Sequence, residues 1–224
     1  MITKSKYTFL IIVLIIFGLN FVNGQEQNEE NKKDNEKLYK QLNFYNLRGT
    51  NAVDLALGTS LITGDFPEPK PEFYFRIGYK RFISEQFGIG FTYNKYNLAY
   101  NDTYYQGFMS FDLNLEYLIS PYTNISPFVY GGYGYNADND FETTGAKVQG
   151  GLGVEFIIVD KVGLKLFGEY NYVMSNESNP IIMEETDLGF FRIGLGANFY
   201  FGGTKKKERL LEEVDTVIKS NYIK

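Results

Sequence analysis

Charged side chains recur inside stretches of this sequence that are otherwise apolar. They stand at alternate positions, so in an extended strand they share one face. Five are acidic and five are basic: Asp54, Arg76, Lys80, Asp112, Glu116, Lys147, Glu155, Lys165, Glu169 and Arg192. Such a balance predicts a buried network of ion pairs, because an unpaired charge away from water is costly. The order of the strands predicts three pairs: Asp54 with Lys80, Glu155 with Lys165, and Glu169 with Arg192.

Enzymatic chemistry has little support in the composition. The sequence contains no histidine and no cysteine, which excludes Ser–His and Cys–His nucleophile pairs and also disulfides. The acidic segment Asp138–Glu142 allows a calcium or lipopolysaccharide-counterion site, with a solvated loop as the alternative. It lacks the glycine and the final glutamate of an EF-hand. We therefore assign no catalytic residue, no cofactor and no metal, and the net charge of −5 gives no support to nucleic-acid binding.

Strands with period-2 alternation must position the charged residues. The sequence predicts them at about 52–63, 72–83, 87–94, 109–117, 127–135, 146–156, 164–172 and 188–201. The last stretch exceeds the roughly 9–11 residues that a tilted strand needs to cross a bilayer. We therefore expect an all-β fold, an eight-stranded antiparallel up-and-down transmembrane β-barrel.

The apolar face of these strands has two possible environments. In a soluble lipocalin-like barrel it would point inward, and this is the structural alternative. Two features favour lipid on the outside. Several apolar sets end in aromatic residues such as Tyr117 and Tyr172, as the aromatic girdles of membrane barrels do. The polar sets mix glycine with long charged side chains, which a narrow lumen requires and a solvated surface does not.

Residues 1–24 have the pattern of a secretory signal peptide. Lys4 and Lys6 precede the apolar run Phe9–Phe17, and a cleavage site follows at Gly24. A membrane-anchoring helix is the alternative, but the run has about half of the ~20 residues that a span needs.

Three further regions follow the signal peptide. Residues 25–50 are predicted to be a polar periplasmic lead-in, residues 51–202 the outer-membrane barrel, and residues 203–224 a periplasmic tail with a short helix over 206–214. The connections between strands alternate between long and short. Long extracellular loops and short periplasmic turns are typical of outer-membrane barrels.

Two resemblances to known families accompany this pattern. The signal peptide, the eight alternating strands and the end Gly196-x-x-Phe199-x-Phe201 resemble small outer-membrane barrels of the OmpA and OmpX type. This resemblance implies that Gly196, Phe199 and Phe201 are a signal for the barrel-insertion machinery. A fainter resemblance, over Asn43–Asp65, Phe108–Leu118 and Asp215–Asn221, is to a barrel region of curli production assembly/transport proteins of Bacteroidetes-type bacteria.

These observations predict an integral barrel in the outer membrane of a Gram-negative bacterium, with a structural or surface-interaction role and no open pore. Two alternatives remain: an accessory of a secretion or curli-type fibre-assembly system, and a lipid-modifying enzyme, which the lack of histidine disfavours. The expected partners are outer-membrane lipid and lipopolysaccharide, the insertion machinery, and a periplasmic or secretion partner bound through the tail. No nucleic acid is expected.

Overall fold

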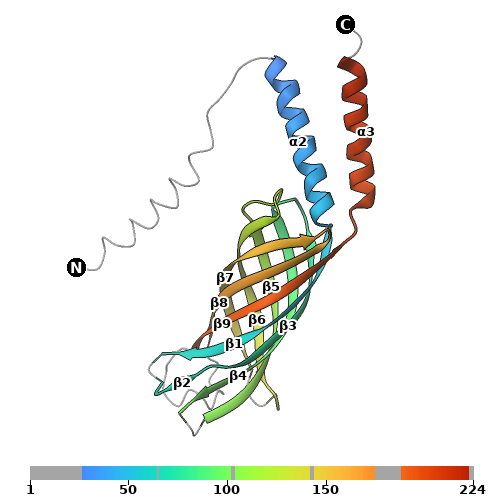
Figure 1. The fold of residues 1–224 in the computed structure, drawn as a ribbon. Coiled ribbons are helices and arrows are strands. Elements are labelled where there is room, and N and C mark those ends of the chain that lie inside the picture. Colours follow the sequence, from blue (N-terminus) through green and yellow to red (C-terminus); the bar gives the residue numbers. More distant parts are fainter. Residues whose placement is uncertain (1–26, 65, 102–103, 142–143, 175–187, 222–224) are drawn as a thin grey trace, which may run out of the picture. The chain divides into compact units, whose positions relative to one another are not determined.

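A closed antiparallel barrel dominates the computed structural model, which describes residues 27–64, 66–101, 104–141, 144–174 and 188–221. Each barrel strand pairs with its neighbours in sequence, and the last returns to the first, as predicted (Figure 1). The eight strands are β1 (Asn51–Thr63), β3 (Glu72–Phe82), β4 (Phe87–Tyr100), β5 (Tyr104–Leu118), β6 (Ile125–Asp138), β7 (Thr144–Val159), β8 (Val162–Val173) and β9 (Leu188–Phe201).

The strands extend further than the sequence indicated at two connections. In the predicted loop over 95–104, β4 continues to Tyr100 and pairs there with Tyr104 of β5; in the predicted loop over 136–145, β6 continues to Asp138 and β7 begins at Thr144. A two-residue strand, β2 (Pro69–Lys70), was also not predicted; it pairs with the end of β4. Backbone N–H and C=O groups need hydrogen-bond partners, so two neighbouring strands continue to pair until the chain turns.

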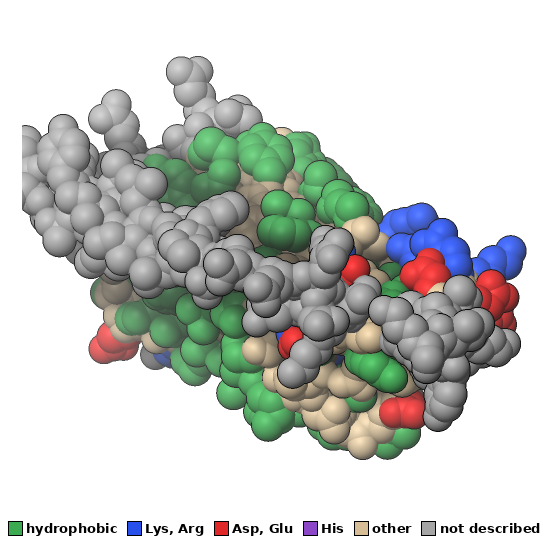
Figure 2. Space-filling view, turned by 90° about the horizontal axis from the view of Figure 1, so that it is seen from above, with side chains coloured by type: hydrophobic (Ala, Val, Ile, Leu, Met, Phe, Trp, Pro, Cys, Tyr) green, Lys and Arg blue, Asp and Glu red, His purple; other side chains and the backbone are tan. Residues whose placement is uncertain are grey.

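Apolar side chains cover the outside of the barrel wall (Figure 2). On β1, Leu55 and Leu57 are exposed, whereas Asp54 and Ala56, which alternate with them, are buried. Leu195 of β9 is 67% exposed and Arg192 of the same strand is fully buried. A surface this apolar is stable in lipid and not in water. This excludes the alternative of a soluble lipocalin-like barrel.

The two ends of the barrel differ. At one end, here called the turn end, short connections such as 83–86 and 160–161 join the strands, and the chain enters β1 and leaves β9. At the other, the loop end, β1, β4, β6 and β8 end, and β3, β5, β7 and β9 begin. The loop over 175–187 and the predicted signal peptide over 1–24 fall outside the described residues.

Two helices flank the barrel in sequence: α2 (Gln27–Leu47) and α3 (Thr204–Asn221). The chain divides into one unit up to Lys37 and a second from Leu38 onward, which holds the end of α2, the barrel and α3. The helix predicted over 206–214 is confirmed and is longer at both ends. No described helix is long and apolar enough to span a membrane.

The last turns of α2, which lie within the predicted lead-in over 25–50, enter the turn end of the barrel. Leu42, Phe44 and Arg48 are buried, and the Phe44 ring packs edge-on against Phe82 of β3. Lys161, in the turn between β7 and β8, donates to the carbonyl oxygens of Tyr45 and Arg48 at 2.5 Å each, so it satisfies two carbonyls at the helix end.

Candidate functional site

The candidate site is the charged interior of the barrel. All ten predicted lumen residues lie on inward positions and are at most 7% exposed. The described strands place them at three levels along the barrel.

At the level nearest the loop end, Arg192 is the centre of the network. Its guanidinium bonds the carboxylate of Glu169 and also Asp112 at 3.0 Å. Lys147 donates to the same Asp112 at 2.8 Å and to Asn171 at 2.6 Å. Asp112 and Glu169 each therefore receive two cationic partners or more, as buried carboxylates require.

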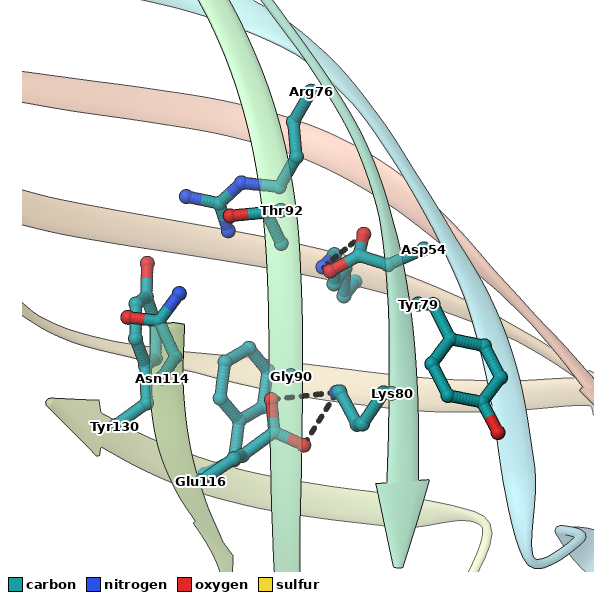
Figure 3. Close-up of a pocket in the computed structure, with 11 residues that line it drawn as sticks. Asp54, Arg76, Tyr79, Lys80, Gly90, Thr92, Asn114, Glu116 and Tyr130 are labelled. Atoms are coloured by element: carbon teal, nitrogen blue, oxygen red, sulfur yellow. Dashed lines mark hydrogen bonds and ion pairs between the residues drawn. The ribbon is translucent and has the colours of Figure 1, made fainter. Parts of the chain in front are cut away.

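At the middle level, two further ion pairs and the side chain of Arg76 line a small cavity (Figure 3). Lys80 bonds Glu116 at 2.5 Å and Lys165 bonds Asp54 at 2.5 Å. Arg76 reaches across the lumen to Glu169 at 2.6 Å. The cavity has a volume of about 20 Å³, which is room for about one water molecule.

At the turn end, Arg48 fills the mouth. Its Nε donates to Glu155 at 2.9 Å, and its Nη1 donates to the carbonyl oxygen of Pro121 at 2.7 Å. Tyr200 and Asn198 of β9 donate to the other oxygen of Glu155. Sequence reasoning missed Arg48; the signal was a lone arginine after a segment, Leu42–Leu47, in which leucine and aromatic residues outnumber the two asparagines.

Apolar side chains close the charged lumen at both ends. Toward the loop end, Tyr96 stacks between Phe108 and Phe190, with ring centroids 5.7 and 4.8 Å apart. Toward the turn end, Phe44 and Phe82 pack together below the charges. This arrangement places the ion pairs in a filled interior of low dielectric, where each pair is electrostatically strong.

The predicted pairings are correct in one case out of three. Glu169 and Arg192 lie opposite each other and form the expected ion pair. Glu155 and Lys165 also lie opposite each other, but their charged groups turn away from one another.

Arg48 explains the two corrected pairs. It takes Glu155, which leaves Lys165 to reach Asp54. Asp54 is then occupied, and Lys80 pairs with Glu116 in place of the predicted Asp54.

Glycines let these side chains cross a strand to reach their partners. Lys165 on β8 reaches Asp54 on β1 over Gly196 of β9, where an added Cβ would lie 2.6 Å from the lysine Cε. Lys147 on β7 reaches Asp112 on β5 over Gly134 of β6, where the corresponding distance is 3.0 Å. Inward glycines thus make room for charged side chains, as expected. In these two cases the glycine lies on the strand between the two partners, so the ion pair joins strands that are not adjacent.

The predicted insertion-signal residues lie on β9 near the turn end. Phe199 and Phe201 face outward, 44% and 47% exposed, and Gly196 faces inward. The ring of Phe201 lies 6.3 Å from Tyr79, within an outward band of aromatic residues. Their role in insertion stays a prediction.

Solved structures with the same fold are small outer-membrane barrels. The chain is similar to neisserial surface protein A (NspA), with a TM-score of 0.57, 15% identity, and coverage of 68% of this chain and 98% of that chain. The N-terminal barrel of Pseudomonas aeruginosa OprF matches with a TM-score of 0.45 and 13% identity over 69% and 99% of the two chains. No protein-family model and no curated protein matches the chain. The fold is that of a small outer-membrane β-barrel.

The apolar exterior and this fold locate the protein in the outer membrane. The barrel strands have 11 to 16 residues, enough to cross the bilayer at a tilt. The resemblance to OmpA-type barrels is confirmed at the level of the fold, and the curli resemblance is not supported by these comparisons.

Proposed function

We propose that this protein is a sealed outer-membrane barrel with a structural or surface-interaction role, and that it conducts no ions. The turn end faces the periplasm and the loop end the cell exterior, as the lengths of the connections favour. No enzymatic activity is proposed, since the chain has neither histidine nor cysteine.

The observation that carries the proposal is the filled lumen. A pore needs a continuous file of water, but Arg192, Lys147, Asp112 and Glu169 are at most 1% exposed and are bonded to each other across the interior. Eight strands enclose a space that side chains alone can fill. The apolar layers toward the loop end and toward the turn end add two further barriers to ions.

Planar bilayers test this proposal. Purified full-length protein reconstituted at single-molecule density should show no steady conductance, whereas a porin measured in the same membrane gives stable open steps. Stable, long-lived channels from the wild-type protein would overturn the sealed-barrel proposal.

A second candidate, an accessory of a secretion or fibre-assembly system, draws on the helices at the turn end. Leu210 and Val214 of α3 pack into the apolar cluster that includes Leu42 of α2, while Leu211 is 46% exposed. A helix pair of this kind offers a surface to a periplasmic partner. Capture of a stoichiometric partner from detergent-solubilised membranes by the wild type, and its loss on Leu211→Glu, supports this candidate over a purely structural role.

A further inference from the structure

A basic groove lies at the turn end, outside the charged lumen. It has a volume of about 380 Å³ and lies where the chain leaves β9 through Gly202 and Gly203 into α3. Its polar lining includes three cationic side chains from distant parts of the chain: Arg81 of β3, and Lys205 and Lys206 of α3.

The positive charge of this groove is uncompensated within the described part of the chain. No described carboxylate forms an ion pair with Arg81, Lys205 or Lys206. Lys206 lies over the ring of Tyr45, 5.9 Å from its centroid, which supplies no formal negative charge. Arg209, one turn further along α3, has its own partner in Glu213 at 4.0 Å.

Helix stability does not account for these lysines. The first turn of α3 contains no acidic residue, and cations at this end of a helix are opposed by the helix dipole. Lys161, in the turn between β7 and β8, is also close to a cation of α3: burial first, and then the charge of Lys207, lowers the pKa of its ammonium group, although Asp160 acts in the opposite direction. A ligand with negative charge would relieve this repulsion.

The groove lies at the level of lipid headgroups. Tyr79 and Phe201 belong to the outward aromatic band near the turn end, and the Tyr79 hydroxyl donates to Asn51 at 2.6 Å. Aromatic bands mark the boundary between hydrocarbon and headgroups. Arg81 is exposed on the same face of β3, two residues closer to the turn end, which is about 6–7 Å along a strand. Its guanidinium therefore stands where lipid phosphates lie.

We propose that this groove binds the phosphate of an anionic glycerophospholipid, with Arg81 and Lys205 as the main contacts and Lys206 as a third. The apolar wall beside Phe201 and Tyr79 receives the acyl chains, and the bound lipid holds the start of α3 at the membrane surface. Which leaflet supplies the lipid rests on the periplasmic orientation proposed above; headgroup binding itself does not.

Native mass spectrometry of the full-length protein in detergent micelles tests the proposal. Phosphatidylglycerol is titrated into the wild type, into the double variant Arg81→Gln/Lys205→Gln, and into the control Lys95→Gln/Arg209→Gln, which also removes one exposed wall charge and one α3 charge. Because each basic residue near an anionic headgroup contributes about fivefold, the groove variant should bind about 25-fold more weakly. The control should stay within about twofold of the wild type.

Three results would overturn the proposal: equal weakening in the groove variant and the control, binding of phosphatidylcholine as tight as that of phosphatidylglycerol, or unchanged binding in the groove variant. Complete displacement of the lipid by millimolar inorganic phosphate would assign the groove to free phosphate instead. All the substituted residues are exposed. The folding of each variant is checked by comparing the gel mobility of unheated and heated samples. Failure here leaves the conductance result unchanged, so the two proposals are judged separately.

Discussion

Arg192 is the residue on which the lumen charges converge. It is fully buried and bonds Glu169, Asp112 and Asn171 through one guanidinium. Arginine suits this position because its planar fork donates in several directions at once and stays charged. Arg192 also lies over two aromatic rings: its guanidinium carbon is 5.0 Å from the ring centroid of Tyr74 and 5.4 Å from that of Tyr96.

Replacing Arg192 by alanine should lower the free energy of unfolding by about 3–5 kcal/mol, because two buried carboxylates each lose one of their cationic partners. Urea titration of the protein folded in lipid vesicles measures this loss. Arg209→Ala on the exposed side of α3 is the matched control and should stay within about 0.5 kcal/mol of the wild type. A neutral Arg192→Ala would mean that water reaches the centre of the lumen.

Gly134 tests the rule that glycines carry ion pairs over a strand. A methyl group there would overlap the Asp112 carboxylate and lie 3.0 Å from the Cε of Lys147, and neither side chain has space to move because both are fully buried. Gly134→Ala should destabilise by about 1–3 kcal/mol in the same urea titration. Gly168→Ala, where an added Cβ meets nothing within 4 Å, should be neutral; equal effects of the two would refute the rule.

At the scale of elements, the end of α2 closes the turn end of the barrel. Its backbone carbonyls are held by Lys161, and its side chains bury against β3 and the turn residues. Burial, followed by the charge of Glu85, raises the pKa of Tyr45 above its usual 10.0. The neutral phenol is thus the form that the docked helix favours.

Alkaline pH should therefore weaken the docking of the end of α2. A raised folded-state pKa means that the contribution of Tyr45 is complete below about pH 10 and is lost as the pH rises through the folded value, because the unfolded chain ionises first. Tyr45→Phe should flatten this part of the stability–pH curve between pH 9 and 12, measured by urea titration. Tyr39→Phe, at a 58% exposed position of the same helix, should leave the curve as in the wild type; an unchanged curve for Tyr45→Phe would contradict the prediction.

At the scale of the whole molecule, the orientation in the membrane is testable because the chain has no cysteine. Asp140, between β6 and β7 at the loop end, and Glu208 on α3 are both exposed. With the loop end outside the cell, Asp140→Cys should react with a membrane-impermeant maleimide on intact cells. Glu208→Cys should react only after lysis. The reverse pattern would invert the proposed orientation.

The sequence by itself determined the fold and the direction of most side chains. Period-2 alternation is local, since successive side chains of a strand point to opposite faces whatever the partner strand is. For this reason β9 begins and ends where predicted, and Asp54, Lys165 and Arg192 all point inward as expected. The sign balance of the lumen was likewise visible without a structure.

Tertiary structure decided which charges meet. A closed and staggered barrel brings together side chains from strands that are not neighbours, so Lys165 reaches Asp54 over Gly196 and not Glu155 opposite it. Arg48 directly follows a helix whose docking no strand pattern encodes, and it forms an ion pair with Glu155. Ion pairing depends on distances of a few ångströms across the lumen, and these are set by barrel closure and by the end of α2, not by spacing along the chain.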